Sequence, residues 1–243
     1  MNNYLRPLIT TAGLLLLWQS VVILFQLPDY ILPSPEQVVK VMHQQRYLLL
    51  HHMLPTLTET LAGFMLGALA GCVAACLIAY FKSLSRWFFP LLIISQALPV
   101  FAIAPLLVIW FGYGPGSKIA AAILMIFFPV TSALYDGLRR TNPGWLELAK
   151  TMNASKHAIF WHIQLPSSLP TLASGLRIAA VVAPVGAIVG EWVGSSKGLG
   201  YLMLNANARL QIDMMFAALL VIITMSLILY WCVDLSLKKI VWW

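Results

Sequence analysis

The chain has 243 residues, of which 60% are hydrophobic and only 9% are charged. Soluble domains usually carry about 25% charged residues, so a water-soluble fold of this length could not cover its surface. Fifteen lysines and arginines against eight aspartates and glutamates give a formal charge of +7. These cations lie at the ends of apolar runs and form no stripe among aromatic residues, which indicates lipid head groups and membrane topology and excludes nucleic acid as a partner.

Six apolar runs approach the length of about 20 residues that a helix needs to cross a bilayer. We therefore expect an all-α membrane protein with a single transmembrane domain over residues 1–243. The expected spans cover residues 8–25, 57–80, 87–111, 119–135, 172–193 and 214–233. The first run is interpreted as a span and not as a signal peptide, because "VVILFQLPDY" offers no small-residue cleavage site.

The distribution of basic residues predicts the orientation of these spans. With the N-terminus inside, ten of the fifteen lysines and arginines fall in cytoplasmic segments, and Lys118 and Lys197 are among the five outside. Both termini are then expected in the cytoplasm. A polar segment at residues 142–166 is expected there as well.

The connection after the first run, "LPSPEQVVKVMHQQRYLLLHHM", predicts a helix on the outer membrane surface. Ser34 and Gln37 have the spacing of a capping box, and Pro35 suits the first helical position. His51 and His52 near its end could bind a metal ion. Adjacent helical residues point apart, however, which favours two exposed polar residues.

The second span contains "GFMLGALAG", in which Gly63, Gly67 and Gly71 recur every four residues. This spacing predicts a smooth groove that another helix can approach closely. Glu59, near the outer end of the same span, either faces a polar cavity or reaches the interface.

Prolines and a glutamine interrupt the third span, "SQALPVFAIAPLLVIWFG". Pro99 removes a backbone hydrogen bond and is expected to bend the helix. Bent membrane helices can line a cavity or act as gates, and Gln96 is polar. We therefore expect Gln96 and Pro99 to belong to a pathway through the membrane. Ordinary packing, for which membrane helices also tolerate prolines, is the alternative.

Motifs for catalysis are missing from the sequence. "FGYGPGSK" resembles a phosphate-binding loop, but Ser117 separates Gly116 from Lys118, so the motif is not formed. The spans contain no histidine and no HExxH motif, and the cysteines are expected to pack as small hydrophobic residues. The sequence thus predicts a protein that is not an enzyme and does not hydrolyse ATP by itself.

The polar segment at 142–166 predicts two short helices joined by a turn. Asn142 is a suitable N-cap for a helix that begins at Pro143 and runs to about Met152. Asn153 would end that helix in the left-handed conformation. Ser155 would then cap a second short helix, which Leu165-Pro166 would close before the fifth span.

One face of the first short helix is expected to be apolar, formed by Trp145, Leu148, Ala149 and Met152. Glu147 lies in the N-terminal half of the helix, where a carboxylate suits the helix dipole. Such a segment is either an amphipathic loop on lipid or a surface for a partner protein.

The same segment resembles the EAA loop of ABC importer permeases. The matching positions are Glu147, Ala149, Ile163, Leu165 and Pro166. The chain departs from the pattern where Leu148 replaces an alanine and where Asn153 replaces a glycine. Asparagine can adopt the same backbone geometry as that glycine.

The resemblance extends over nearly the whole chain. "LPSPEQV", "TLTETLAGFMLGALAG", "PLLVIWFGYGPGSKI" and "GEWVGSSKGLGYLM" are similar to the nitrate/taurine/sulfonate type of permease. The resemblance implies a type I ABC importer permease fold in a bacterial inner membrane. It also implies that Glu147, Ala149, Asn153, Ile163, Leu165 and Pro166 couple the chain to a separate ATPase.

The partners implied by the resemblance are two cytoplasmic ATPase subunits, a second and identical permease chain, and a periplasmic or lipid-anchored solute-binding protein. ATP and Mg²⁺ would bind the ATPase, and no cofactor would bind this chain. Gln96, Pro99, Glu191 and Trp192 would belong to the translocation path or gate. For Glu191, a role in the path and a pairing with Lys197 that holds a gate loop stay open.

The cargo suggested by the resemblance is a pyrimidine precursor of thiamine, because "GSSKGLGYLMLNANARLQIDMMFAAL" is more similar to that branch than to the sulfonate branch. A sulfonate, taurine or nitrate-type anion is the alternative. A secondary transporter is the rival of another class. It would usually show inverted repeats with interrupted helices, and the sequence contains no such pairing.

Overall fold

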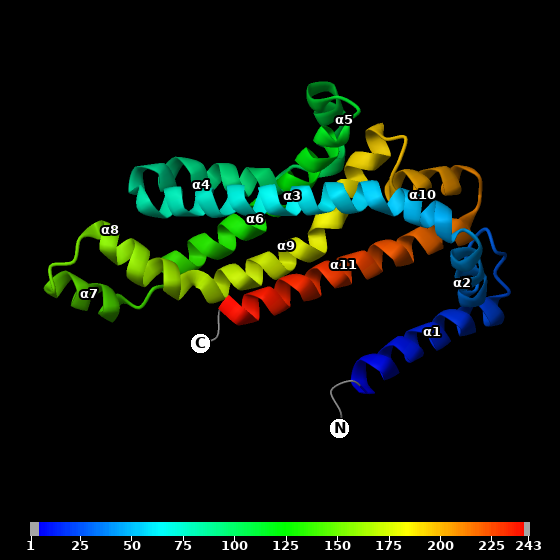
Figure 1. Ribbon diagram of the computed structural model, residues 1–243, viewed down its shortest axis with the longest axis horizontal. Coiled ribbons are helices and arrows are strands. Elements are labelled where there is room, and N and C mark those ends of the chain that lie inside the picture. Colours follow the sequence, from blue (N-terminus) through cyan, green and yellow to red (C-terminus); the bar gives the residue numbers. More distant parts are fainter. Residues whose placement is uncertain (1–4, 241–243) are drawn as a thin grey trace.

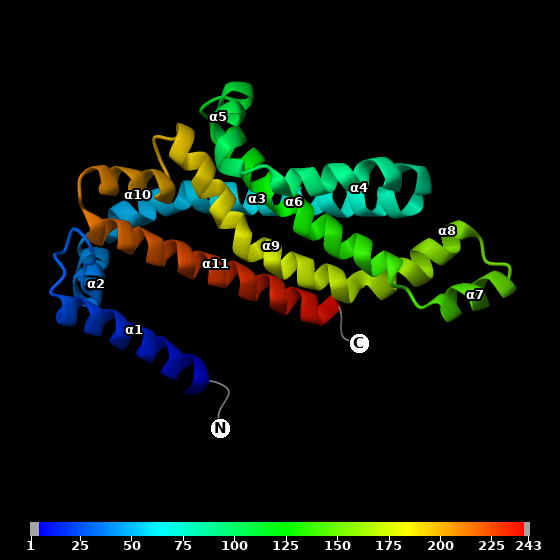
Figure 2. The same ribbon diagram turned by 180° about the vertical axis from the view of Figure 1, so that it is seen from behind.

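The computed structural model describes residues 5–240, which form helices joined by short loops and, within that range, no strand (Figures 1 and 2). The elements are α1 (Leu5–Phe25), α2 (Pro35–Gln44), α3 (Arg46–Tyr80), α4 (Lys82–Ala97), α5 (Val100–Phe111), α6 (Pro115–Arg139), α7 (Pro143–Thr151), α8 (Lys156–Ile159), the π-helical turn η1 (Phe160–Gln164), α9 (Leu165–Gly194), α10 (Leu199–Ala208) and α11 (Ile212–Ile240). The predicted all-α fold is confirmed.

Four helical stretches are long and apolar enough to cross a membrane, namely Arg46–Tyr80, Pro115–Arg139, Lys156–Gly194 and Ile212–Ile240. They contain the second, fourth, fifth and sixth predicted spans. Shorter apolar helices cover Ile9–Phe25 and Val100–Phe111. Figure 1 shows α3, α9 and α11 running along the long axis of the molecule, with α7 and α8 at one end and α2 and α10 at the other.

The third apolar run forms two helices, whereas the sequence predicted one span. The helix stops at Leu98 and Pro99, which both adopt extended backbone angles. A proline cannot donate the next backbone hydrogen bond and disfavours the helical conformation of the residue before it. The result is that α4 runs back along α3, while α5 projects away from the bundle (Figure 1).

The glycine row of α3 packs directly on α6, as its spacing predicts. A Cβ atom added to Gly63 would overlap the Cβ of Ala122, and Gly67 and Gly71 meet Ile126 and Val130 in the same way. The two rows advance by four residues along each helix. The axes therefore approach until backbone and side chains touch.

The helix α6 also meets a second row of small residues, which belongs to α9. Gly186 lies against the Cα of Ala122, and Gly190 lies against the Cα of Lys118. Ala179, Ala180 and Ala183 of α9 are fully buried in the same seam. The helices α3, α6 and α9 therefore pack against one another, and α6 makes close backbone contacts with both of the others.

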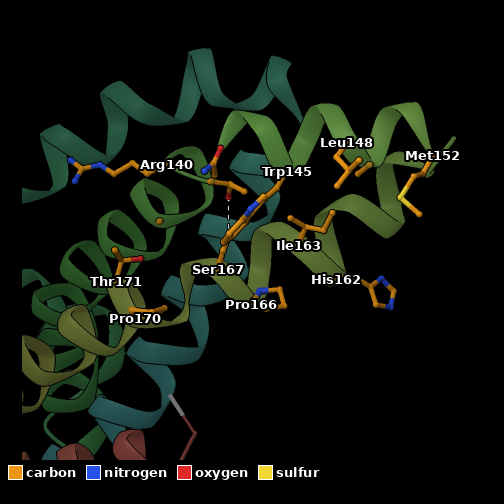
Figure 3. A pocket seen from close by; sticks show the side chains of 14 residues that line it. Arg140, Trp145, Leu148, Met152, His162, Ile163, Pro166, Ser167, Pro170 and Thr171 are labelled. Atoms are coloured by element: carbon orange, nitrogen blue, oxygen red, sulfur yellow. Dashed lines mark hydrogen bonds between the residues drawn. The ribbon is translucent and has the colours of Figure 1, made fainter. Parts of the chain in front are cut away.

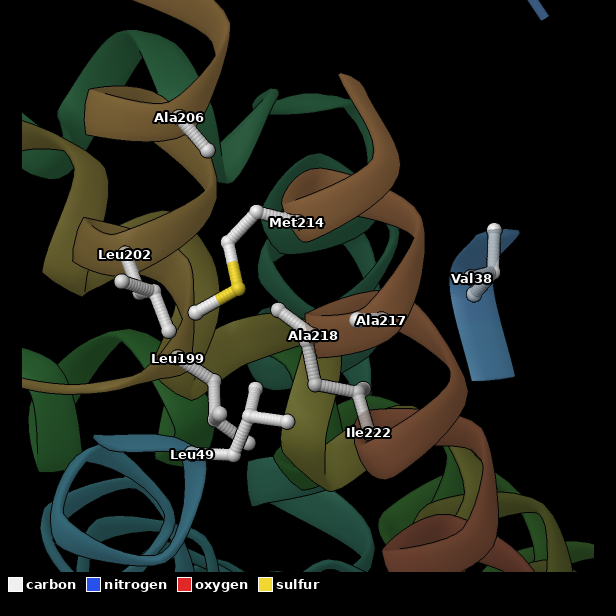
Figure 4. Packing of buried hydrophobic residues seen from close by; sticks show 9 residues of the cluster. All are labelled: Val38, Leu49, Leu199, Leu202, Ala206, Met214, Ala217, Ala218 and Ile222. Carbon is white, nitrogen blue, oxygen red and sulfur yellow. The ribbon is translucent and has the colours of Figure 1, made fainter. Parts of the chain in front are cut away.

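The helix α2 packs against α11. Its capping box is confirmed: the Ser34 hydroxyl accepts from the backbone N–H of Gln37, and the Ser34 backbone N–H donates to Gln37 Oε1 at 2.8 Å. Val38 is fully buried beside Ala217 of α11 (Figure 4). Val38 is thus covered by protein, whereas its neighbour Val39 is 62% exposed. The position of this helix at the outer membrane surface stays a prediction.

We expect Gly63→Ala to destabilise the fold, because the added methyl group must push α3 away from α6. Overpacking of this kind costs about 1–3 kcal/mol. The matched control is Gly13→Ala in α1, where an added Cβ meets nothing within 4 Å. Thermal unfolding midpoints of the two variants in detergent test the expectation, and equal midpoints would contradict the packing of α3 on α6.

Candidate functional site

The first helix of the polar segment, α7, begins as the sequence predicts. The Asn142 side chain accepts a hydrogen bond from the backbone N–H of Gly144 at 2.9 Å, and Pro143 is the first helical residue. Proline needs no hydrogen-bond partner at this position. The helix ends at Thr151, with Met152 as its C-cap.

The turn after α7 has the left-handed residue that the sequence predicts. Asn153 has a φ angle of 61°. The N–H of Ala154 donates to the carbonyl of Ala149 and the N–H of Asn153 to that of Lys150, both at 2.9 Å. These two bonds form a Schellman motif, which satisfies the last carbonyls of α7.

The second helix of the segment does not end at Leu165-Pro166, so this part of the prediction is wrong. Ser155 caps α8 by accepting from the N–H of Ala158 at 3.2 Å. The chain then passes through the π-helical turn η1, in which the N–H of Leu165 donates to the carbonyl of Phe160. The helix α9 follows without a break, so one helical stretch extends from Lys156 to Gly194.

A groove of about 740 Å³ lies between α7 and the beginning of α9 (Figure 3). The four residues predicted to share the apolar face of α7 all line it. Trp145, Leu148 and Met152 are 55%, 61% and 74% exposed, whereas Ala149 is buried. A hydrogen bond of 3.1 Å between the hydroxyl groups of Thr141 and Ser167 joins the two sides of the groove.

The six residues of the EAA-like pattern divide into groups. Ala149, Ile163 and Pro166 line the groove, and Asn153 forms the turn beyond it. Glu147 is exposed on α7 and is not part of the groove lining. Leu165 packs inward against the hydrophobic cluster formed by α3, α4, α6 and η1.

The helix α8 attaches residues 142–166 to the rest of the molecule through contacts with α3. The Lys156 ammonium donates to the backbone carbonyl of Tyr80 at 2.7 Å and lies 4.3 Å from the centre of its ring. Phe160 contacts the same ring edge to face at 5.4 Å. The inner end of α3 therefore holds α8 in place.

At the opposite end of α9, Glu191 is buried and accepts two hydrogen bonds. The Thr56 hydroxyl donates to Glu191 Oε1 and the N–H of Gly200 donates to Oε2, both at 2.6 Å. Thr56 in turn accepts from the N–H of Leu199 at 2.8 Å. In the described part of the chain, Glu191 thus holds the loop through backbone groups and makes no ion pair with Lys197.

Lys118, which the distribution of basic residues places on the outer side, is only 1% exposed. Its ammonium donates to the carbonyls of Tyr113 at 2.6 Å, Gly114 at 3.0 Å and Gly194 at 2.5 Å. An ammonium group has three donors, and all three are used. Lys118 therefore joins α6 and the α5–α6 loop to the last carbonyl of α9.

The two adjacent histidines differ in exposure, so the prediction of two exposed polar residues is wrong for one of them. His51 is exposed, while His52 is buried and accepts from the N–H of Gly198 at 3.1 Å. The described residues contain no group of three or more side chains that could hold a metal ion. We call the bonds of His52, Thr56, Lys118 and Glu191 to residues 194–200 the outer clamp.

Glu59 is buried beside the outer clamp. It lines a cavity of about 590 Å³ together with Lys118, Thr58 and the exposed Lys197. Because Glu59 is only 6% exposed and lines a cavity with polar members, its position favours the cavity over the interface of the two alternatives left by the sequence.

The proposed path residues do not all meet. Gln96 and Pro99 lie exposed at the break between α4 and α5. Trp192 lines a cavity near the outer clamp and contacts Phe101 of α5 edge to face at 6.1 Å. Neither Gln96 nor Pro99 lines that cavity or belongs to the outer clamp.

Several residues at the outer end were missed by sequence reasoning. Thr56 begins the quoted stretch "TLTETLAGFMLGALAG" but was given no role, His52 was weighed only as a metal ligand or an exposed polar residue, and Lys118 was counted only as a basic residue on the outer side. The available signal was the glycine-rich loop "GSSKGLG", whose Gly198 has a φ angle of 108° and lies directly against the Glu191 carboxyl group. A side chain at position 198 would occupy the place of that carboxyl group.

Long apolar helices, a grooved two-helix segment at one end and a hydrogen-bonded clamp at the other define the chain as a membrane permease. Residues 63–242 match the family described as "Binding-protein-dependent transport system inner membrane component". The chain belongs to this family and is an ABC importer permease of the nitrate/taurine/sulfonate type. It is a multi-pass protein of the bacterial inner membrane.

Three relatives support this membership. A probable ABC transporter permease protein of Haemophilus influenzae is 52% identical over 98% of this chain and 97% of its own length. The formylaminopyrimidine transport permease protein ThiX of Halalkalibacterium halodurans is 38% identical, over 81% of this chain and 79% of its own. The riboflavin transport system permease protein RibX of Chloroflexus aurantiacus is also 38% identical, over 97% and 88%.

A solved structure of the MetNI methionine ABC transporter in inward-facing conformations contains a chain of the same fold. The TM-score is 0.69, with 17% sequence identity over 81% of this chain and 97% of that chain. At this identity the likeness concerns the fold, which is that of type I ABC importer permeases.

We expect Thr56→Val to weaken the outer clamp, because valine keeps the shape of threonine but leaves Glu191 Oε1 and the N–H of Leu199 without a partner. Buried groups left unpaired cost about 1–3 kcal/mol each. Hydrogen exchange of the amides at residues 198–200 should rise. In the control Thr58→Val, an exposed hydroxyl that bonds only to the carbonyl of Pro55 is removed. Equal exchange in both variants would contradict the clamp.

Proposed function

We propose that this permease carries a thiamine pyrimidine precursor across the membrane, and that residues 142–166 couple its helices to a cytoplasmic ATPase. The observation that carries the coupling proposal is the groove beside α7. It exposes large apolar side chains at the end of a helical stretch that continues to Gly194. An apolar groove on a fixed helical support is the kind of surface that receives a partner protein.

The proposed partners follow from the class of transporter. Two ATPase subunits, one on each of two identical permease chains, would close around ATP and Mg²⁺ in the cytoplasm. A solute-binding protein, soluble or lipid-anchored, would deliver the cargo from the outer side. In this arrangement the groove lies in the cytoplasm and the outer clamp faces the binding protein, as the distribution of basic residues predicts.

The cargo proposal is supported by the relatives and by the chemistry near the outer clamp. Two permeases that are 38% identical to this chain are named for formylaminopyrimidine and riboflavin, both flat nitrogen heterocycles. The cavity beside Trp192 is lined by aromatic, small and amide side chains. A sulfonate, taurine or nitrate-type anion is the second candidate. Membership of a binding-protein-dependent family gives no support to a secondary transporter.

Uptake by the reconstituted complex tests the cargo. Proteoliposomes containing the permease, its ATPase and its binding protein should accumulate formylaminopyrimidine when ATP is supplied. Taurine should compete weakly or not at all. Accumulation of taurine without any accumulation of formylaminopyrimidine would contradict the proposed cargo and favour the anion alternative.

Glu147→Lys should abolish ATPase binding and uptake while the protein stays folded. The side chain is exposed, so its reversal leaves the packing unchanged, but a reversed charge at a protein interface can cost several kcal/mol. The control is Glu36→Lys, which reverses an equally exposed carboxylate on α2 at the other end of the molecule. Co-purification of the ATPase and uptake into vesicles are measured. Wild-type values for Glu147→Lys would contradict the coupling role.

Asn153→Gly should leave uptake unchanged, whereas Asn153→Val should impair it. Glycine adopts a φ angle of 61° readily, while a β-branched residue is strained there by about 1–3 kcal/mol. The strain would open the Schellman motif and displace α7 from the groove. Uptake and ATPase co-purification should fall together, and equal activity of the two variants would show that the turn plays no part in coupling.

A further inference from the structure

A cavity of about 660 Å³ lies at the outer end of the molecule, beside the outer clamp. Three aromatic side chains line it: Tyr113 of the α5–α6 loop, Trp192 of α9 and Tyr201 of α10. We call it the aromatic cavity. Its volume falls within the range of about 300–1,000 Å³ that is typical of small-molecule sites.

Two of the three rings are held by their neighbours. Tyr201 stacks on the buried His52 at 5.9 Å, and Trp192 contacts Phe101 at 6.1 Å. Tyr113, in contrast, is 79% exposed. The cavity therefore has two fixed aromatic walls and a third ring that is accessible from solvent.

The polar groups of the aromatic cavity are neutral. The Nδ2–H group of Asn205 donates a hydrogen bond to the carbonyl of Tyr201 at 3.0 Å. Its Oδ1 accepts no hydrogen bond from the described side chains and backbone groups. The Ser196 hydroxyl is exposed beside it, whereas the Ser195 hydroxyl is occupied by the backbone of Lys197. An amide oxygen accepts hydrogen bonds and a serine hydroxyl can donate or accept them, which suits an amino group and a ring nitrogen.

Nothing in the aromatic cavity offers a free positive charge. None of the described residues that line it is a lysine, an arginine or a histidine. The nearby Lys118 is turned away, because its three donors are all used by carbonyls. Inside this lining a sulfonate or carboxylate would thus lose hydration without gaining a charged partner, which is costly. The exposed Lys197 lines the neighbouring cavity, which shares Tyr113 and Ser196 with this one.

We propose that the aromatic cavity is a binding subsite for a flat, uncharged, amino-substituted nitrogen heterocycle. The ring would stack among Tyr113, Trp192 and Tyr201, and its amino group would donate to Asn205 Oδ1. The inference rests on the proposed cargo and adds to it the residues that select an aromatic ring over an anion.

The test compares Tyr113→Ala with Tyr113→Phe in the complete transport complex, with formylaminopyrimidine as the probe. Stacking of a ring on an aromatic side chain contributes about 1–3 kcal/mol. Tyr113→Ala should therefore raise the KM for uptake at least about fivefold, while Tyr113→Phe keeps the ring and stays near wild type. Because Tyr113 is exposed, its truncation leaves the fold intact. The control Tyr47→Ala removes a tyrosine that is 73% exposed on α3 and does not line the cavity.

A second measurement does not depend on transport. Ser196→Cys in the same complex is labelled from outside with a membrane-impermeant maleimide. Millimolar formylaminopyrimidine should slow this labelling, and millimolar taurine should not. In the control variant Tyr47→Cys, neither compound should change the rate of labelling.

The outcomes separate the subsite from the cargo. If wild type accumulates formylaminopyrimidine but Tyr113→Ala keeps the wild-type KM and Ser196→Cys is not protected, the subsite is wrong and the cargo stands. If wild type carries taurine only, the cargo is wrong. Protection of Ser196→Cys by formylaminopyrimidine in that complex would still support the subsite, and protection by taurine would overturn it.

Discussion

The close approach of α3 and α9 to α6 is the constraint on which the rest of the structure depends. Glycines and alanines remove the side chains that would otherwise separate these helices, so Gly63 and Gly186 both reach Ala122. In lipid, van der Waals packing of this kind replaces the hydrophobic effect as the main attraction between helices. The three packed helices form a stable centre, from which α5, α7 and α10 extend.

This centre connects the groove with the outer clamp. The helix α9 has Pro166 in the groove and Glu191 in the clamp, about 40 Å apart at 1.5 Å per residue. Close to the groove, the hydroxyl groups of Thr141 and Ser167 join the end of α6 to α9. At the other end, Lys118 joins α6 to Gly194. A movement of α7 by a partner protein would therefore reach the clamp through a pair of helices that are bonded at both ends.

The sequence predicted those features that depend on local backbone chemistry. The capping residues Ser34, Asn142 and Ser155, the left-handed Asn153 and the glycine row of α3 all follow from neighbouring residues and have the expected geometry. For the same reason the apolar face of α7 was predictable, and it became the lining of the groove. The roles of the EAA-like residues and of the path residues remain predictions.

Features that depend on distant parts of the chain were not predictable. The burial of Lys118 requires the carbonyl of Gly194, 76 residues further along the chain, and the burial of His52 requires the N–H of Gly198. The helix α10 lies in a segment where no helix was expected. Likewise, the continuity of α8 with α9 depends on the π-helical turn before Pro166, and the sequence pattern contains no signal for that turn.

Site-specific photo-crosslinking tests the central claim, that the groove beside α7 receives the ATPase. A photoreactive residue replaces Leu148, which is 61% exposed in the groove, and in a matched variant it replaces Leu235, which is 59% exposed on α11. Illumination of the complete complex should link position 148 to the ATPase subunit and position 235 to lipid alone. If position 148 yields lipid adducts and no ATPase adduct while the ATPase is bound, residues 142–166 are a lipid-facing segment and do not couple the two proteins.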